Sequence, residues 1–131
     1  MASPDVKKRA AIKVLIAEDD ANIVESLSFV LGQEGFAVSA AFDGDEALRR
    51  LQRDPPDVVV LDLMLPKRSG FEVLKAVKTD PALRHLPVMV LTAKGQPHDR
   101  RLAEEIGVEA FMTKPFSNTE VVDAVRRLAQ A

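Results

Sequence analysis

The sequence predicts an α/β fold built on a doubly wound, five-stranded parallel sheet, and two features of its pattern indicate this class. Short apolar runs alternate with stretches of helical period five times from Lys13 onward. The runs are rich in β-branched residues, which is typical of strands buried on both faces. Strands that alternate with helices this regularly need crossover connections, so we expect them to be parallel and covered by helices on both sides.

The predicted strands are the five apolar runs, in chain order. They are Val14–Ala17, Phe36–Ala41, Val58–Leu61, Val88–Leu91 and Ala110–Thr113. The third run is the most informative, because Asp62 follows its four apolar residues directly. A carboxylate at the carboxyl end of a buried strand lies where open α/β sheets bind their ligands.

Amphipathic stretches between the strands predict helices. Apolar residues share one face in three of these stretches, namely Ile23, Leu27, Val30 and Leu31, then Phe71, Leu74 and Val77, and finally Val121, Val122, Val125 and Leu128. Capping-box spacing predicts two helix starts, at Ser69 with Glu72 and at Ser117 with Glu120. Left-handed helix ends are expected at two glycines, Gly35 and Gly107.

Length and composition favour a single cytoplasmic domain. A chain of 131 residues can bury roughly 68% of the surface that it exposes when unfolded. The net charge of -2 argues against a nucleic-acid-binding surface, because phosphate backbones select for a basic face. The absence of cysteine excludes disulfides and thiolate chemistry. No apolar segment has the length of a signal peptide or a membrane span, so we expect no membrane insertion.

The two ends of the chain differ in pattern. Residues 1–11 carry Ser3, Pro4 and the basic trio Lys7-Lys8-Arg9 without periodicity, and we expect a flexible tail there. Residues 12–131 are predicted to form the domain. The chain stops at Ala131, just past the last helical pattern, so we expect no second domain in it.

Acidic, hydroxyl and basic side chains follow four of the predicted strands. They are Glu18-Asp19-Asp20 after the first, Asp62 after the third, Thr92 after the fourth and Lys114 after the fifth. The crossover rule puts the first and third strands side by side where the chain reverses direction, so Glu18, Asp19 and Asp62 should converge. Converging carboxylates without histidine or cysteine favour a hard cation. The sequence therefore predicts a Mg²⁺ site.

The same residue types suit phosphoryl chemistry. Asp62 can attack a phosphorus atom and form an acyl phosphate. Mg²⁺ and Lys114 would offset the charge on the phosphoryl oxygens, and the hydroxyl of Thr92 would donate to another of them. Nothing nearby would activate water strongly, so we expect the adduct to persist long enough to carry information.

Four features in order resemble the receiver domain of two-component response regulators, the CheY-like family, over about Lys13 to Leu128. They are Glu18-Asp19, the spacing Asp62-x-x-x-Pro66-x-x-x-Gly70, the pair Thr92-Ala93 and the pair Lys114-Pro115. The resemblance implies a flavodoxin-like fold with the strand order 2-1-3-4-5. It also implies a phosphoprotein of two-component signalling that promotes its own phosphorylation and dephosphorylation and is not a turnover enzyme.

The resemblance also implies how the acidic residues act. Asp62 would accept a phosphoryl group from a phosphohistidine on a histidine kinase or phosphotransfer protein, with Mg²⁺ as cofactor. Asp19 would bind the metal directly, and Glu18 would bind it through water. Asp62 and the backbone carbonyl of Met64 would complete the protein ligands.

A switch and a tuning pair are implied as well. Thr92 and Phe111 resemble the switch pair of the family, and the Lys114-Pro115 bond would be cis. Met64 and Lys94 occupy positions that tune hydrolysis of the adduct, while Thr92 and Lys114 assist the reaction itself.

The expected partner surface is the face formed by the fourth helix, the fifth strand and the fifth helix. The segment Leu61–Pro66 is similar to receivers of winged-helix transcription factors, which tend to dimerise through this face. A downstream protein is expected to bind there, without nucleic acid or membrane as a partner of this domain. A phosphorylation-dependent homodimer is left open, because Glu109-Ala110 stands where those relatives often have an acidic pair.

Two departures from the family pattern leave alternatives. Glu18 stands where the family usually has aspartate, and a shifted register would make Asp19 and Asp20 the ligand pair. The distance from the strand Val14–Ala17 favours Glu18 with Asp19. Phe111 stands where many relatives have tyrosine, so packing alone would have to drive the switch.

Other function classes fit parts of the pattern. The chain could be a receiver cut from a longer DNA-binding regulator, or a pseudo-receiver that binds partners without phosphorylation. A flavin binder needs a phosphate-binding loop after the first strand, where this chain has three acids. A phosphatase of the haloacid dehalogenase type needs an Asp-x-Asp pair there, whereas Asp19 and Asp20 are adjacent.

Overall fold

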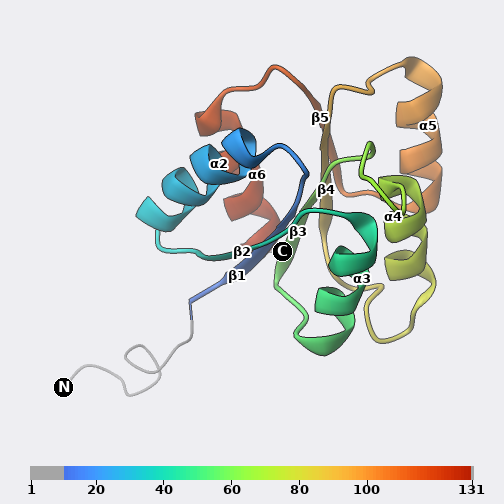
Figure 1. Ribbon diagram of the computed structural model, residues 1–131, viewed down its shortest axis with the longest axis horizontal. Coiled ribbons are helices and arrows are strands. Elements are labelled where there is room, and N and C mark those ends of the chain that lie inside the picture. Colours follow the sequence, from blue (N-terminus) through green and yellow to red (C-terminus); the bar gives the residue numbers. More distant parts are fainter. Residues whose placement is uncertain (1–10, 131) are drawn as a thin grey trace.

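A computed structural model describes residues 11–130, which form a parallel five-stranded sheet between two layers of helices (Figure 1). The elements, in chain order, are β1 (Lys13–Ala17), α2 (Ala21–Gln33), β2 (Ala37–Ala41), α3 (Gly44–Arg53), β3 (Val58–Leu61), α4 (Gly70–Thr79), β4 (Val88–Thr92), α5 (Pro97–Ile106), β5 (Ala110–Thr113) and α6 (Asn118–Gln130). The strands lie in the order β2-β1-β3-β4-β5. The predicted class, the parallel pairing and the strand order are confirmed. Residues 1–10 of the predicted tail lie outside the described residues.

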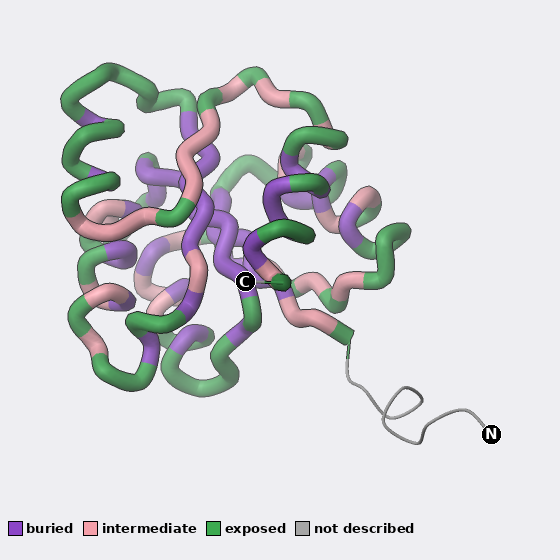
Figure 2. Tube along the Cα trace, turned by 180° about the vertical axis from the view of Figure 1, so that it is seen from behind, coloured by how far each residue is buried: buried purple, intermediate pink, exposed green. Residues whose placement is uncertain are grey.

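The helices α2 and α6 cover one face of the sheet, and α3, α4 and α5 cover the other (Figure 1). All four residues of β3 are buried, and they alternate between the two cores. Val58 and Val60 contact the core under α2 and α6, while Val59 and Leu61 contact the opposite core. Figure 2 shows the buried strands at the centre of the fold, with exposed residues on the outer helical turns. This two-sided burial explains why the strands read as continuous apolar runs.

The predicted helix boundaries are confirmed at both capping boxes. The Ser69 hydroxyl accepts from the Glu72 amide at 3.2 Å, and the Ser117 hydroxyl accepts from the Glu120 amide at 3.0 Å. Gly107 ends α5 in the left-handed region, with φ of 119°. The strands differ from prediction only at their ends, where β1 starts at Lys13, β2 starts one residue later and β4 includes Thr92.

The start of α4 lies against the segment that carries Asp62, and glycine is required there. A Cβ added to Gly70 would lie 2.1 Å from the backbone oxygen of Asp62 and 2.5 Å from the Cα of Leu63. The Gly70 amide also donates to the Leu63 carbonyl at 2.9 Å. This contact fixes the loop that follows β3 and thereby the position of Asp62. Within residues 11–130, the helices are too short or too polar to span a bilayer.

Candidate functional site

Three carboxylates converge at the carboxyl edge of the sheet, as the crossover argument predicted. The last residues of β1 and β3, Ala17 and Leu61, lie side by side in the register of the two strands. Glu18, Asp19 and Asp62 each offer an oxygen, and these oxygens lie within 4.8 Å of one another. Glu18 and Asp62 are buried, whereas Asp19 is exposed, so the group is open to solvent on one side.

Backbone hydrogen bonds hold the two buried acids in place. The Asp62 amide donates to the Ala17 carbonyl at 2.9 Å, and the Glu18 amide donates to the Ala41 carbonyl at 3.0 Å. The Met64 amide donates to Asp62 Oδ1 at 3.0 Å, which turns that carboxylate into the bend after β3. Both acids are thus oriented by neighbouring strands rather than by flexible loops.

Asp20 serves a structural purpose, which favours the Glu18 with Asp19 register. Its Oδ1 accepts from the amides of Asn22 at 2.9 Å and Ile23 at 3.4 Å, so it caps the start of α2. Its own amide donates to Glu18 Oε2 at 3.1 Å. The side chain of Asp20 is therefore committed to the helix, and Glu18 and Asp19 are left to face Asp62.

Lys114 enters the acidic group from the end of β5. Its Nζ lies 2.7 Å from Glu18 Oε1 and 2.9 Å from Asp62 Oδ2. Burial acts to lower the pKa of Lys114, but the hydrogen bonds to Glu18 and Asp62 outweigh it and raise the pKa above its ordinary value. Lys114 is therefore a permanent cation in the group. The predicted cis bond between Lys114 and Pro115 is present.

The two buried acids have opposite pKa shifts. Burial raises the pKa of Glu18, and the hydrogen bonds from Lys114 and the Asp20 amide only partly offset it. Burial also acts to raise the pKa of Asp62, but the Met64 amide, Lys114 and the Thr92 hydroxyl outweigh it and lower the pKa. Asp62 is consequently ionised at neutral pH, which is the form that acts as a nucleophile.

Thr92 and Phe111 lie on the same face of neighbouring strands. Thr92 is the last residue of β4 and is fully buried, and it pairs in register with Thr113. Phe111 lies two residues before Thr113 and is half-buried, so the period of two along a strand directs both side chains to one face. The guanidinium carbon of Arg100 lies 5.4 Å from the centre of the Phe111 ring.

The two predicted tuning residues lie at the rim of the site. Met64 is 58% exposed beside Asp62, so its side chain borders the approach to the carboxylate. The backbone amide of Lys94 donates to the Thr92 hydroxyl at 3.0 Å. The Nζ of Lys94 lies 4.0 Å from Asp99 Oδ1. Lys94 thus links the end of β4 to the start of α5.

Asp99 is a buried acid that sequence reasoning missed. It is 3% exposed, and its Oδ2 has no hydrogen-bond partner among residues 11–130. Its Oδ1 lies 3.2 Å from His98 Nε2. An acid in the first turn of a helix is common at exposed sites, so the sequence carried no signal for this burial.

The comparisons with known proteins agree with this geometry. The family model described as response regulator receiver domain matches residues 14–126. The transcriptional regulatory protein PhoP of alkaline phosphatase synthesis in Bacillus subtilis is 40% identical over 116 residues, which cover 88% of this chain and 48% of that protein. The phosphate regulon transcriptional regulatory protein PhoB of Escherichia coli is also 40% identical, over 88% of this chain and 51% of that protein. The chain thus spans about half the length of these relatives.

Solved receivers have the same fold. The receiver domain of the Francisella response regulator 1452 is 31% identical with a TM-score of 0.84, and the match covers 90% of this chain and 96% of that one. The chemotaxis response regulator CheY4 of Vibrio cholerae is 29% identical with a TM-score of 0.84, covering 91% and 99%. The chain therefore belongs to the response regulator receiver domain family.

Proposed function

We propose that Asp62 accepts a phosphoryl group from a phosphohistidine of a partner protein and that the chain thereby acts as a phosphorylation-controlled switch. The observation that carries the proposal is an ionised carboxylate, Asp62, held 2.9 Å from the ammonium of Lys114 beside two further acids. Because the ammonium already contacts the nucleophile, it can stabilise the negative charge of the carboxylate before transfer and that of the phosphoryl oxygens after it.

The transfer balances without a further reactant. An oxygen of Asp62 forms a bond to phosphorus, and the bond between phosphorus and the histidine nitrogen breaks. The electron pair of that bond stays on the imidazole, which takes a proton from solvent. Lys114 lies where it offsets charge on the transferred group, and Thr92 supplies a hydroxyl donor from β4.

The donor set fits Mg²⁺. The three carboxylate oxygens of Glu18, Asp19 and Asp62 lie within 4.8 Å, and hard oxygen ligands are those that Mg²⁺ prefers. These residues, with the backbone carbonyl of Met64, would hold the ion. When bound, it would supply positive charge that offsets the charge of the phosphoryl oxygens. Asp19 is the exposed member and lies on the side from which an ion or a donor approaches.

The switch uses Thr92 and Phe111. Phosphorylation adds about −1.5 to −2 charge at Asp62, which attracts the hydroxyl of Thr92 away from the Lys94 amide. Phe111 then turns into the space that Thr92 leaves, and the Arg100 guanidinium loses its place over the ring. The equilibrium between two arrangements of α5, β5 and α6 shifts, and this face binds the downstream partner.

A second candidate is the receiver part of a longer DNA-binding regulator. The observation that favours it is coverage, since the chain spans about half of relatives described as transcriptional regulatory proteins. In that case the face formed by α5, β5 and α6 would bind a second receiver in a phosphorylation-dependent dimer. In neither case does the chain turn over a substrate.

The test is intact-mass spectrometry after incubation with acetyl phosphate and Mg²⁺. We expect one added phosphoryl mass on the parent and none on Asp62→Asn. Asp123→Asn, which removes an exposed acid of α6, should be phosphorylated like the parent. An adduct that survives in Asp62→Asn, or no adduct on the parent, would contradict the proposal.

A further inference from the structure

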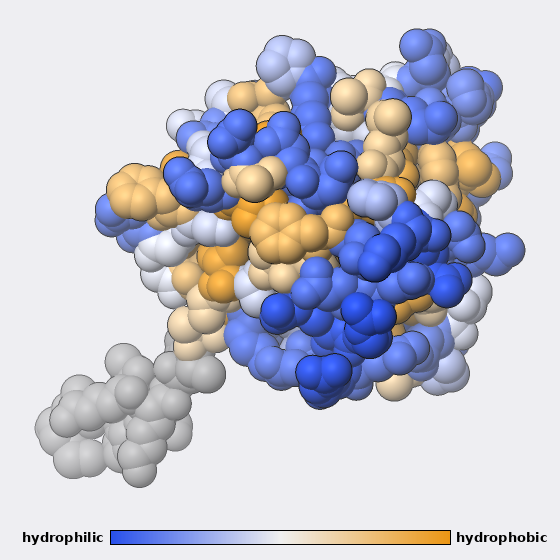
Figure 3. All heavy atoms as spheres, viewed as in Figure 1, coloured by the Kyte–Doolittle hydropathy of each residue, from blue (hydrophilic) through white to orange (hydrophobic). Residues whose placement is uncertain are grey.

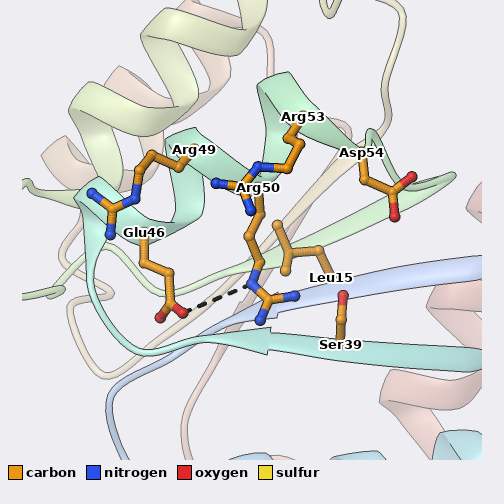
Figure 4. A pocket seen from close by; sticks show the side chains of 7 residues that line it. All are labelled: Leu15, Ser39, Glu46, Arg49, Arg50, Arg53 and Asp54. Atoms are coloured by element: carbon orange, nitrogen blue, oxygen red, sulfur yellow. Dashed lines mark ion pairs between the residues drawn. The ribbon is translucent and has the colours of Figure 1, made fainter.

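A hollow of about 350 Å³ lies between α3 and the edge strand β2 (Figure 4). Its floor includes Leu15 of β1 and Ser39 of β2, and α3 forms its opposite wall. The three carboxylates of the phosphoacceptor site are not among its lining residues. The hollow is therefore a separate feature of the fold, which the proposed phosphotransfer does not use.

Three arginines of α3 line this hollow, Arg49, Arg50 and Arg53. Figure 4 shows Arg50 reaching from the helix toward Ser39 on the strand. Arg50 has only a loose ion pair, at 3.8 Å from Glu46, and half of its side chain is buried. Arg49 and Arg53 make no ion pair with any residue in the range 11–130. Their guanidinium groups are consequently available to an anion.

The charge of the hollow matches a dianion. Two acids also line it, Glu46 and Asp54, and Asp54 is bound by Lys13 at 2.6 Å. Lys13 lies outside the lining, but its ion pair offsets the charge of Asp54. The three lining arginines therefore face one remaining acid, Glu46, which leaves two positive charges. A phosphomonoester carries about −1.5 to −2 charge at neutral pH, whereas one carboxylate carries less. Guanidinium groups also match phosphate oxygens through paired hydrogen bonds.

The size and the floor of the hollow favour an organic phosphate. A volume of about 350 Å³ is larger than a phosphate ion needs and falls within the range of about 300–1,000 Å³ found for small-molecule sites. The Ser39 hydroxyl can donate to a phosphate oxygen, while the side chain of Leu15 offers an apolar surface. We propose that this hollow binds a phosphomonoester of a small organic molecule, with its phosphate on Arg50, Arg53 and Ser39.

The test is a titration of the chain with adenosine 5′-monophosphate and with inorganic phosphate, followed by NMR. Both are added in EDTA without Mg²⁺, because the acidic group around Asp62 then repels phosphate. We expect saturable shifts at the Ser39 amide and the Arg50 side-chain N–H, with tighter binding of the nucleotide. Loss of phosphoryl acceptance at Asp62 would leave this result unchanged, so the two proposals fail separately.

Matched variants separate a site from general charge attraction. Arg50→Gln with Arg53→Gln should weaken binding about tenfold or more, as loss of charge-assisted hydrogen bonds predicts. Arg101→Gln with Arg127→Gln removes the same charge from α5 and α6 and should change it less than about twofold. Ser39→Ala, which keeps every charge, should weaken binding a few-fold.

Three results would overturn the proposal. One is the absence of saturable shifts at millimolar ligand, and another is equal weakening in both arginine pairs. The third is binding to vesicles that contain phosphatidic acid without binding of the nucleotide, which would assign the hollow to lipid headgroups instead.

Discussion

Lys114 joins Asp62 through a 2.9 Å salt bridge across 52 residues of sequence, and the same ammonium lies 2.7 Å from Glu18. The cation thus holds together two buried carboxylates that would otherwise repel each other. The Lys114 side chain therefore stabilises the folded site, and it lies where it can neutralise a phosphoryl group on Asp62.

Replacing Lys114 by methionine should destabilise the fold. The change leaves Glu18 and Asp62 as two facing, buried carboxylates. Removing one partner of a buried ion pair in this way costs about 3 kcal/mol. Urea unfolding in EDTA measures the loss. Added Mg²⁺ should restore more stability to the variant than to the parent, because the ion replaces the missing positive charge. Equal stability of the two proteins in EDTA would contradict the role given to Lys114.

Glu18→Gln and Asp20→Asn should differ in metal affinity. Glu18 faces Asp62, so losing its charge should weaken Mg²⁺ binding about tenfold. Asp20 caps α2 through Oδ1, and asparagine keeps an oxygen in that position, so its variant should bind Mg²⁺ nearly as the parent does. Calorimetric titration with Mg²⁺ compares them. A larger loss in Asp20→Asn would reverse the assignment of the ligand pair.

Thr92→Ala should separate phosphorylation from response. The variant keeps Asp62 and Lys114, so mass spectrometry should show the phosphoryl adduct. Hydrogen exchange over residues 97–113 should change on phosphorylation of the parent and change little in the variant, because no hydroxyl is drawn toward Asp62. Thr119→Ala, at an exposed position of α6, is the control and should respond normally. A full exchange response in Thr92→Ala would rule out this coupling.

Two glycine-to-alanine changes should have opposite effects. At Gly70 the new methyl would lie 2.1 Å from the Asp62 backbone oxygen, so the segment must move, at about 1 to 3 kcal/mol. At Gly32, the next-to-last residue of α2, nothing lies within 4 Å of the new methyl, and alanine should stabilise the helix by about 0.5 kcal/mol. Thermal unfolding of both variants tests the pair. If Gly70→Ala were as stable as the parent, the close contact with Asp62 would not hold in solution.

The sequence predicted those features that depend on local pattern and on the rules of chain crossing. The apolar runs predicted the five strands, and the capping boxes predicted two helix starts. The crossover rule predicted that Glu18, Asp19 and Asp62 lie close together. Strand order then located Lys114 at the same edge. These predictions succeeded because a parallel sheet puts the carboxyl ends of its strands on one side.

Features that depend on packing between helices and the sheet were not predicted. Asp99 reads as an ordinary helix-start acid, and only the fold shows that it is buried. In the sequence, the polar side of α3 includes Arg49, Arg50 and Arg53. The hollow that they line depends on the spacing between α3 and β2. Figure 3 likewise shows apolar side chains on the surface, and Phe29 is 66% exposed on the outer face of α2. Spacing along one element carries no information on distances between elements.

The N-cap of α3 should make stability depend on pH. Asp43 Oδ1 accepts from the Glu46 amide at 2.7 Å, and this hydrogen bond lowers the pKa of Asp43 below its ordinary value, with a further contribution from Lys67. A carboxyl whose pKa is lower in the folded state stabilises the fold above its unfolded pKa of about 3.9 and loses this contribution as the pH falls through the folded value. Asp43→Asn should therefore be less stable than the parent at neutral pH.

The gap between Asp43→Asn and the parent should close as the solution is acidified. Urea unfolding between about pH 7 and about pH 3 measures it, because the carboxyl of the unfolded parent takes up a proton over the lower part of that range while the folded one keeps its charge to lower pH. Asp123→Asn removes one charge from an exposed position of α6 and controls for the change in net charge. Asparagine also accepts a hydrogen bond at an N-cap, so the gap reports the charge of Asp43 rather than the cap as a whole. A gap that stays constant down to about pH 3 would mean that this charge does not stabilise α3.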